Sequence, residues 1–415
     1  MNVKIDLSRV VPEKAILSQY NDQIESSLDT LWSNEDIRSE WVKVPMQISK
    51  EQIDEIMMTA LAAQDSCGLF VVIGNGGDCQ GIKGIIEATK DKSKTAPEME
   101  FVGESISSDE LGKTVERMKH YEVNVCVISK SGETLETIVA YKYIKQYMEN
   151  RYGKEIAAKR IMVLTGSSES NLKKIARESG SGIFNLSENF VGNFSILSPA
   201  SLLILAIAGI NIERFLSGAE VMATDPFWDI DGGHYAVMRK LLNESGRSTE
   251  FISFSKDSFR ALSIWIANLF MEAGSKKQNS LLVMPYNKPR DFKSRSEFLR
   301  ENKDRIIITE IDSENTMDSS EMLDEIVDDA QNRWTAKDID IIGDDFYKEL
   351  FKRTSWEGDI RIAIPKSDAF NMGQLAYYFL MTGSIYSYIT LENPYDRDLI
   401  NEIKGSLTYD DIVGE

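Results

Sequence analysis

Short apolar runs that alternate with helical segments constrain the fold of this chain more than any other feature. From Leu69 onward these runs are LFVVIG, FVG at 101–103, VNVCVIS, RIMVLTG and GIFNL at 182–186. Continuous apolar strands separated by helices are typical of βαβ units, in which helices cover both faces of a parallel sheet. The sequence therefore predicts an α/β domain built on a parallel sheet.

A second series with the same alternation begins near Asp231. Its expected strands are STEFISF, SLLVMP and RIIIT, and the chain later continues with RIAIP and a long helix from Met372 to about Tyr388. A chain of 415 residues exceeds the size at which one hydrophobic core stops growing. Two α/β domains are therefore expected.

The predicted organisation has four parts. A helical N-terminal segment covers residues 1–50, a first domain covers 51–228, a second domain covers 229–390, and a C-terminal tail covers 391–415. The acidic, mostly helical stretch within 312–358 is interpreted as a solvated elaboration, because runs of charge are usually solvated faces.

Charge and cysteine usage argue against several classes of protein. The chain has 47 Lys and Arg against 66 Asp and Glu, a net charge of −19, so no nucleic-acid or anionic-membrane partner is expected. Its three cysteines have no CxxC spacing and give neither a disulfide framework nor a zinc signature. The N-terminus lacks a signal pattern, and the longest apolar run, around Leu202 to Ile210, is too short to span a bilayer. A cytoplasmic protein is expected.

Two glycine-containing loops follow predicted strands, and ligands of parallel α/β sheets bind at the carboxyl ends of strands. The first loop is GNGGDCQG at 74–81. A dinucleotide fingerprint GxGxxG would need glycine at 79, where Cys79 stands, so a nucleotide-binding oxidoreductase is a distant alternative.

The second loop, SKSGET at 129–134, leads directly into a helical segment. Hydroxyl side chains and exposed backbone N–H groups at the positive end of a helix favour binding of an anion such as phosphate. The alternative is that Ser131 and Thr134 merely cap the helix. The loop alone leaves both interpretations open.

Six segments, in order, resemble motifs of the glucose-6-phosphate isomerase family. FVVIGNGGDCQG resembles VVIGIGGSxLG, FVGESIS resembles FxGxxIS, and VISKSGETLET resembles ISKSGTTTE. VGNFSILSPASLLILAIAGINI is similar to GGRFSVLSxVGLLPxAxAGID, NLFMEAGSKK to LxxESxGK, and LENPYDRDLINEIK to NPFDQPGVExxK. The matches extend over about residues 69–404, and the chain is identified as a divergent member of the family.

The resemblance implies a fold and an activity. It implies two αβα-sandwich SIS-type domains with mainly parallel sheets, plus helical N-terminal and C-terminal segments, in a homodimer whose active sites lie at the interface. It also implies isomerisation of glucose 6-phosphate and fructose 6-phosphate in glycolysis and gluconeogenesis, through an enediolate and without metal or organic cofactor. This chemistry needs a carboxylate base, a cation near the oxygens and a proton donor for ring opening.

Catalytic and binding residues are carried over position by position. Glu272 matches the family's catalytic glutamate and Lys404 its ring-opening lysine. The predicted substrate-binding positions are Gly76, Gly77, Asp78, Ser129, Lys130, Ser131, Thr134, Glu136, Asn193 and Arg397.

Several of these positions depart from the family pattern. Asp78 replaces a serine, and a carboxylate about 4 Å from a dianion would cost on the order of 1 to 4 kcal/mol per unit charge. Asn193 replaces the arginine that stabilises the enediolate, a loss that typically costs about 10²- to 10³-fold in rate. Lys293 stands at the position of the ring-opening histidine, which the partner subunit supplies in family dimers, and Glu133 replaces a threonine. Arg397 replaces a glutamine and could restore the missing positive charge.

These departures leave two main functional hypotheses. One is a working phosphosugar isomerase, favoured because Glu272, Lys404 and the SKSGET loop are retained. The other is a catalytically impaired paralogue that binds a sugar phosphate as a sensor or partner. It is favoured by the simultaneous changes at Asp78, Asn193, Lys293 and Arg397. Binding without turnover would separate the second hypothesis from the first.

Overall fold

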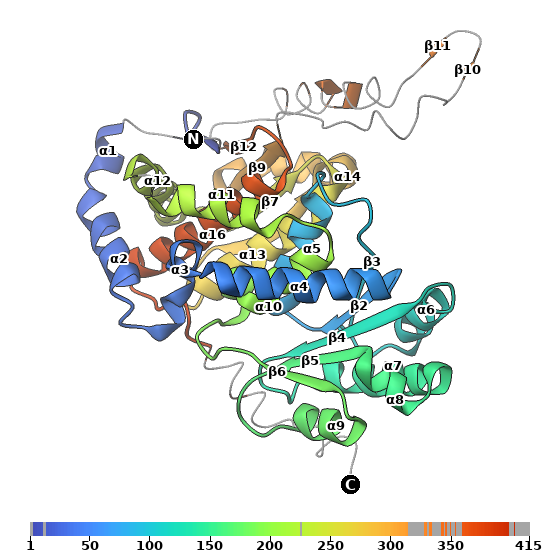
Figure 1. Cartoon of the computed structure of the whole chain (residues 1–415). Helices are drawn as coiled ribbons and strands as arrows, with labels where there is room; N and C mark the ends of the chain where they lie inside the picture. Colours follow the sequence, from blue (N-terminus) through green and yellow to red (C-terminus); the bar gives the residue numbers. More distant parts are fainter. Residues whose placement is uncertain are drawn as a thin grey trace. The chain divides into compact units, whose positions relative to one another are not determined.

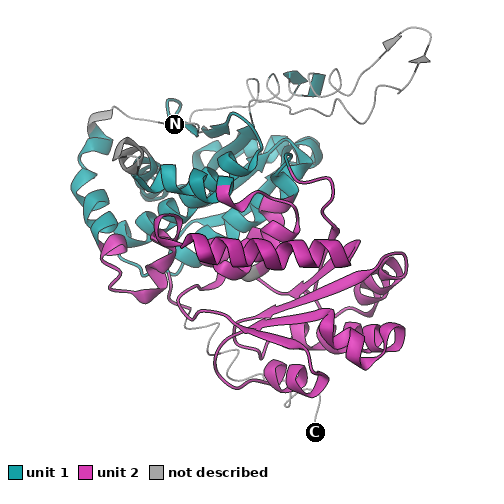
Figure 2. Cartoon of the chain, viewed as in Figure 1, with its two compact units in different colours: residues 1–29, 87–91, 214–394 teal, residues 30–86, 92–213, 395–415 magenta. Residues whose placement is uncertain are grey.

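The computed structural model describes residues 3–10, 14–224, 226–313 and 359–397, with a few isolated residues between 328 and 353 and at 402. Lys404 and most of the acidic stretch 312–358 lie outside the described residues. The chain forms two compact units (Figure 2). Unit 1 contains Met1–Asp29, Glu87–Asp91 and Arg214–Pro394, and unit 2 contains Thr30–Ile86, Lys92–Glu213 and Tyr395–Glu415.

Unit 2 is built on the first predicted sheet. Across the sheet the strands are β3 (Glu98–Val102), β2 (Leu69–Gly74), β4 (Val123–Ser129), β5 (Ile161–Thr165) and β6 (Gly182–Asn185), and every neighbouring pair is parallel. β2 and β4 are buried along their whole length, as their continuous apolar sequence requires. Gly74 pairs with Ile128 and Ser129 with Thr165, so the carboxyl ends of β2, β4 and β5 meet at one edge.

Helices cover both faces of this sheet (Figure 1). One face packs on α6 (Ser108–Met118), α7 (Leu135–Tyr152), α8 (Lys154–Lys159) and α9 (Asn171–Ser179), whose apolar residues share a core with alternate strand residues. On the other face lie α4 (Lys50–Ser66), α5 (Gly77–Ala88) and α10 (Pro199–Ile207), with the 3₁₀ helix η2 (Gly192–Leu197) before α10.

Unit 1 is built on the second predicted sheet. Its strand order is β1 (Lys4–Asp6), β12 (Asp359–Ile364), β9 (Ile306–Ser313), β7 (Thr249–Phe254) and β8 (Leu282–Asn287). All neighbours are parallel except β1, which pairs antiparallel with β12. The main helices are α11 (Ile212–Thr224), α12 (Pro226–Glu244), α13 (Arg260–Gly274), α14 (Lys288–Glu301) and α16 (Ala369–Ile389). The expected α/β architecture with two mainly parallel sheets is confirmed.

Short elements complete the described chain. They are α1 (Lys14–Ser18), α2 (Asn21–Ser33), η1 (Ile37–Val42), α3 (Val44–Gln47), η3 (Asp257–Phe259), η4 (Lys303–Arg305), β10 (Asp328–Asp329) and β11 (Asn332–Arg333). Among the described helices, none is long and apolar enough to cross a membrane.

The N-terminal segment differs from the wholly helical prediction, because β1 is a strand. Three residues cannot establish a strand from their own pattern; β1 exists because Lys4, Ile5 and Asp6 pair with the edge strand β12. The segment also divides between the two compact units, with residues 1–29 in unit 1. The predicted boundary at residue 50 therefore stays a prediction. The two compact units are defined by contacts between residues and not by this boundary.

A fully buried ion pair lies in the core of unit 1. Arg239 Nε donates to Glu250 Oε2 over 2.6 Å, and neither side chain is exposed to solvent. Glu250 Oε1 also accepts hydrogen bonds from Tyr235 (2.8 Å) and Thr309 (2.7 Å). The Arg239 guanidinium lies 3.9 Å from the centroid of the Phe270 ring, a cation–π contact. The carboxylate thus depends on this arginine for its charge compensation.

Replacing Arg239 by methionine is expected to destabilise the protein by about 3 to 5 kcal/mol, because Glu250 would keep a buried charge without its cation. The double variant Arg239→Met/Glu250→Gln removes both charges and should recover part of this loss. Urea unfolding followed by circular dichroism measures both effects. Equal stability of Arg239→Met and the wild type would contradict the expectation.

Candidate functional site

The loop after β2 has two glycines with different steric roles. Gly76 adopts φ +74°, a left-handed conformation that glycine tolerates best. A Cβ atom added to Gly77 would lie 2.3 Å from the backbone N of Asn193 and 2.5 Å from the carbonyl carbon of Gly192. The loop therefore lies directly against the start of η2. Asp78 belongs to the first turn of α5, and its side chain lies outside the described residues.

Replacing Gly77 by alanine is expected to force these two segments apart, because the new methyl group would overlap backbone atoms that cannot rotate away. Such overpacking costs about 1 to 3 kcal/mol, and the displacement moves Asn193. The free energy of unfolding should fall by this amount, and urea unfolding followed by circular dichroism measures the change. An unchanged free energy of unfolding would show that the loop does not lie against the start of η2.

The loop after β4 is held by its own hydroxyl groups. Ser129 Oγ accepts from the backbone N of Gly132 (3.1 Å) and donates to Thr134 Oγ1 (3.3 Å). Ser131 Oγ accepts from the backbone N of Glu133 (3.2 Å). Thr134 occupies the N-cap position of α7 but makes no side-chain capping bond. The interpretation that Ser131 and Thr134 merely cap the helix is therefore not supported by the geometry.

The loop is also well placed to bind an anion. It ends at the start of α7, a helix of 18 residues, and Glu136 is the acidic residue of its first turn. Ser129 is buried, Ser131 is exposed, and Thr134 is half-buried. Backbone N–H groups and the positive end of the helix dipole favour an anion at such a terminus.

Lys130 lies in this loop, and its ammonium group contacts backbone oxygens. Its Nζ donates to the carbonyl of Glu188 (2.7 Å) and to that of Phe190 (3.0 Å). These bonds join the loop to the segment that leads into η2. The sequence comparison missed this partnership, because backbone carbonyls leave no signal in side-chain identity.

Asn193 is brought to the same region by η2. It is 5% exposed and lies with its backbone against Gly77. Within unit 2 the structure therefore brings together three predicted groups: the Gly76–Gly77 turn, residues 129–134, and Asn193. An amide at this position can hydrogen-bond a substrate oxygen but adds no positive charge.

The remaining predicted residues come from other elements. Arg397 belongs to unit 2 and is half-buried; it follows Tyr395, whose ring packs on Phe194 with 5.0 Å between centroids. Glu272 and Lys293 belong to unit 1. Glu272 lies near the end of α13 and has a buried carboxylate oxygen, whereas Lys293 is exposed on α14. Lys404 lies outside the described residues.

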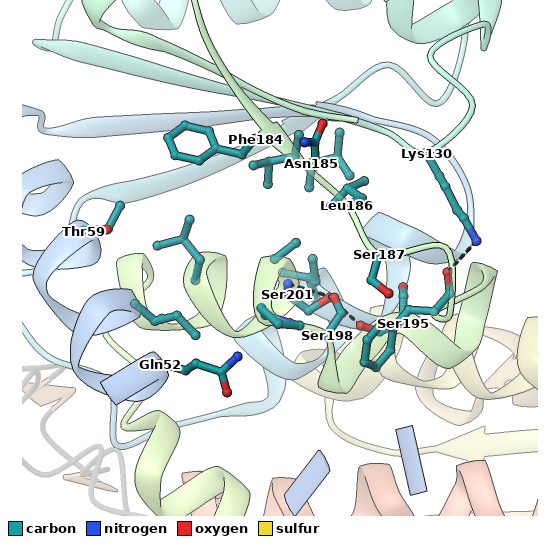
Figure 3. Close-up of a pocket in the computed structure, with 18 of the residues that line it drawn as sticks. Gln52, Thr59, Lys130, Phe184, Asn185, Leu186, Ser187, Ser195, Ser198 and Ser201 are labelled. Atoms are coloured by element: carbon teal, nitrogen blue, oxygen red, sulfur yellow. Dashed lines mark hydrogen bonds between the residues drawn. The ribbon is translucent and has the colours of Figure 1, made fainter. Parts of the chain in front are cut away.

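A cavity of about 320 Å³ adjoins the loop after β4 (Figure 3). Strands β4, β5 and β6 contribute Ile128, Leu164 and Phe184 to its wall, and helices α4 and α10 close the opposite side. Serines at the start of α10 also line it, but Ser201 Oγ already donates to the carbonyl of Ser195 (2.7 Å). The wall is mainly apolar, so a phosphorylated sugar with its many hydroxyl groups fits the two loops better than this cavity.

Charged groups elsewhere do not form a metal centre in the part of the chain that the structure describes. No group of three or more His, Cys, Asp or Glu side chains there is placed to hold a metal ion. The candidate site of unit 2 contains hydroxyls, an amide, backbone N–H groups and the Lys130 ammonium, together with the carboxylates of Glu133 and Glu136.

Comparisons with known proteins show which sequences and which solved fold this chain resembles. The family model for phosphoglucose isomerase matches residues 42–237. Glucose-6-phosphate isomerase of Clostridioides difficile is 28% identical over 382 residues, covering 88% of this chain and 85% of the relative. The enzyme of Acetivibrio thermocellus is 27% identical over 425 residues, covering 98% and 95%. A crystal structure of glucose-6-phosphate isomerase from Chlamydia trachomatis superimposes with a TM-score of 0.80 and 14% identity, covering 100% of this chain and 88% of that one.

Proposed function

Because the chain is a divergent member of the phosphoglucose isomerase family, we propose that it interconverts glucose 6-phosphate and fructose 6-phosphate. The observation that carries this proposal is the loop of residues 129–134, in which hydroxyls and a glycine backbone lie at the start of α7 without a side-chain cap on Thr134. A phosphate group bound there would meet donors and the positive end of a helix dipole.

We assign each step of the isomerisation to particular residues. Glu272 acts as the base that moves a proton between C1 and C2 of the open-chain sugar, and the intermediate is an enediolate. Lys404 and Lys293 assist ring opening, in which the bond between the anomeric carbon and the ring oxygen breaks. The ring oxygen gains a proton, which Lys293 donates, and the anomeric hydroxyl gives up a proton as the carbonyl forms. Asn193 and Arg397 contact the enediolate oxygens, with Arg397 supplying the positive charge that Asn193 lacks.

The proposal also includes an oligomeric state and a cellular role. We expect a homodimer in which Lys293 of one subunit completes the site of the other. We also expect a cytoplasmic role in glycolysis and gluconeogenesis, with no organic cofactor or metal. Size-exclusion chromatography with light scattering tests the dimer.

A second candidate function is sugar-phosphate binding without efficient turnover. The observation that favours it is the buried position of Asn193, which is 5% exposed and brings no charge where the family pattern has an arginine. Loss of one such electrostatic contact typically lowers the rate by about 10²- to 10³-fold.

The experiment that tests the proposed function is a coupled assay in both directions. The protein is produced in a host strain that lacks its own glucose-6-phosphate isomerase, so that contamination cannot supply the signal. We expect saturable conversion of fructose 6-phosphate to glucose 6-phosphate. Calorimetric binding of fructose 6-phosphate without any conversion would favour the second candidate, and absence of both would overturn the proposal.

A further inference from the structure

Glu133 is the most unexpected residue of the loop that is proposed to bind phosphate. It stands between Gly132 and Thr134, where the family pattern has a threonine. A carboxylate a few ångströms from a phosphate dianion is repelled by it, and the repulsion grows as water is excluded from the site. The structure shows which groups bind the Glu133 carboxylate.

The Glu133 carboxylate is bound by the first residue of α9. Its Oε1 accepts from the backbone N of Asn171 (2.7 Å), and its Oε2 accepts from Asn171 Nδ2 (2.8 Å). The first backbone N–H groups of a helix have no partner within the helix, and the positive end of its dipole stabilises an acid. The Glu133 carboxylate therefore lies at the start of α9, and Glu136 is the acidic residue in the first turn of α7.

The neighbouring residue of the loop is fixed at the same place. The backbone N of Leu172 donates to the carbonyl of Gly132 (3.0 Å), next to the Glu133–Asn171 bonds. Gly132 adopts φ +66°, and a Cβ atom there would lie 2.1 Å from Ser170 Oγ. Two consecutive loop residues are thus docked on the first turn of α9.

We propose that Glu133 and Asn171 form a positioning pair for sugar-phosphate binding. The pair fixes the shape of the loop and directs the Glu133 charge away from the phosphate. This inference rests on the proposed function, because it assigns a role within the same site. Neither residue contacts the substrate; both act through the loop.

Replacing Asn171 by aspartate tests the pair, because the substitution is expected to affect the stability of α9 and the affinity for sugar phosphate differently. An aspartate in the first turn of α9 interacts favourably with the helix dipole, which offsets part of the stability lost with the Asn171 Nδ2 donor. The new carboxylate repels Glu133 and drives its charge toward the phosphate site. We expect the Kd for fructose 6-phosphate, measured by calorimetric titration, to rise about tenfold.

Changing the ionic strength and adding a second substitution show whether the affinity loss of Asn171→Asp comes from charge repulsion or from an altered loop conformation. The deficit of Asn171→Asp should shrink when ionic strength is raised from about 0.01 to 0.5 M, because screening shortens the reach of exposed charges. In Glu133→Gln/Asn171→Asp, the glutamine can accept from the backbone N of residue 171 and donate to the aspartate. Affinity in this double variant should return to within about threefold of the wild type.

Asn150→Asp is the matched control. Asn150 is exposed near the far end of α7 and receives the same substitution and charge, so affinity should not change. The inference is overturned if Asn171→Asp binds like the wild type, or if its deficit persists in the double variant and at high salt. A wild-type protein that binds neither fructose 6-phosphate nor inorganic phosphate would instead overturn the proposed function.

Discussion

Replacing Glu272 by glutamine is expected to lower kcat for fructose 6-phosphate by about 10²- to 10⁴-fold while KM changes little. Glutamine has the shape of glutamate but cannot accept the proton that moves between C1 and C2. The half-buried side chain near the end of α13 should keep its place, because the substitution removes a charge and no volume. KM is preserved because the phosphate is proposed to bind the loop of residues 129–134.

The coupled assay measures both parameters, and Glu301→Gln is the matched control. Glu301 is exposed at the end of α14 in the same compact unit, so its substitution should leave kcat and KM unchanged. If Glu272→Gln kept more than a tenth of the wild-type kcat, Glu272 would not be the base. Retained binding of fructose 6-phosphate in a variant without turnover would agree with the assigned role.

Gly373→Ala is expected to destabilise unit 1 by about 3 kcal/mol or more, the upper range for overpacking. A Cβ atom at this position would lie 1.8 Å from the backbone carbonyl oxygen of Phe215. Gly218 faces the reverse contact, with a Cβ atom 1.9 Å from the carbonyl oxygen of Phe370. The two glycines let α11 and α16 approach until their backbones touch, and a methyl group at either position would push the helices apart.

Urea unfolding followed by circular dichroism measures this loss, with Gly112→Ala as the control. Gly112 lies inside α6 with no atom within 4 Å of an added Cβ, so alanine there should stabilise by about 0.5 to 1 kcal/mol. The double variant Gly218→Ala/Gly373→Ala should cost less than the sum of the single losses, because the first methyl group already separates the helices. If Gly373→Ala were as stable as the control variant, the close approach of Gly373 to the Phe215 carbonyl would be contradicted.

Several central strands of the two sheets could be predicted closely because their signal is local. VNVCVIS was expected as a strand at 123–129, and β4 has these bounds. A run of β-branched and apolar residues that is buried on both faces needs no distant partner to be recognised. Helix starts were less accurate: the long helix was expected from Met372, whereas α16 begins at Ala369, where Asp368 accepts from the backbone N of Asn371.

The sequence predicted which positions belong to the candidate site, but it did not predict which groups their side chains contact. The motif comparison placed Ser129, Thr134 and Gly77 in ligand loops, and the structure brings these loops together with Asn193. It did not indicate that the Lys130 ammonium also donates to the carbonyls of Glu188 and Phe190, and the phosphate-binding role of Lys130 stays a prediction. The roles assigned to Glu272, Lys293, Lys404 and Arg397 stay predictions.

By itself, the sequence determined the α/β class, the order of the strands along the chain and the loops that end at the carboxyl edge of the first sheet. Periodicity and glycine placement carry this information, because they report on each residue's own backbone and burial. Tertiary structure alone decided that β1 would be a strand, that Glu133 would bind Asn171, and that Gly373 would meet Phe215. Each of these depends on a partner far away in the chain, and nothing in the local sequence specifies which backbone group will come within hydrogen-bonding or van der Waals distance.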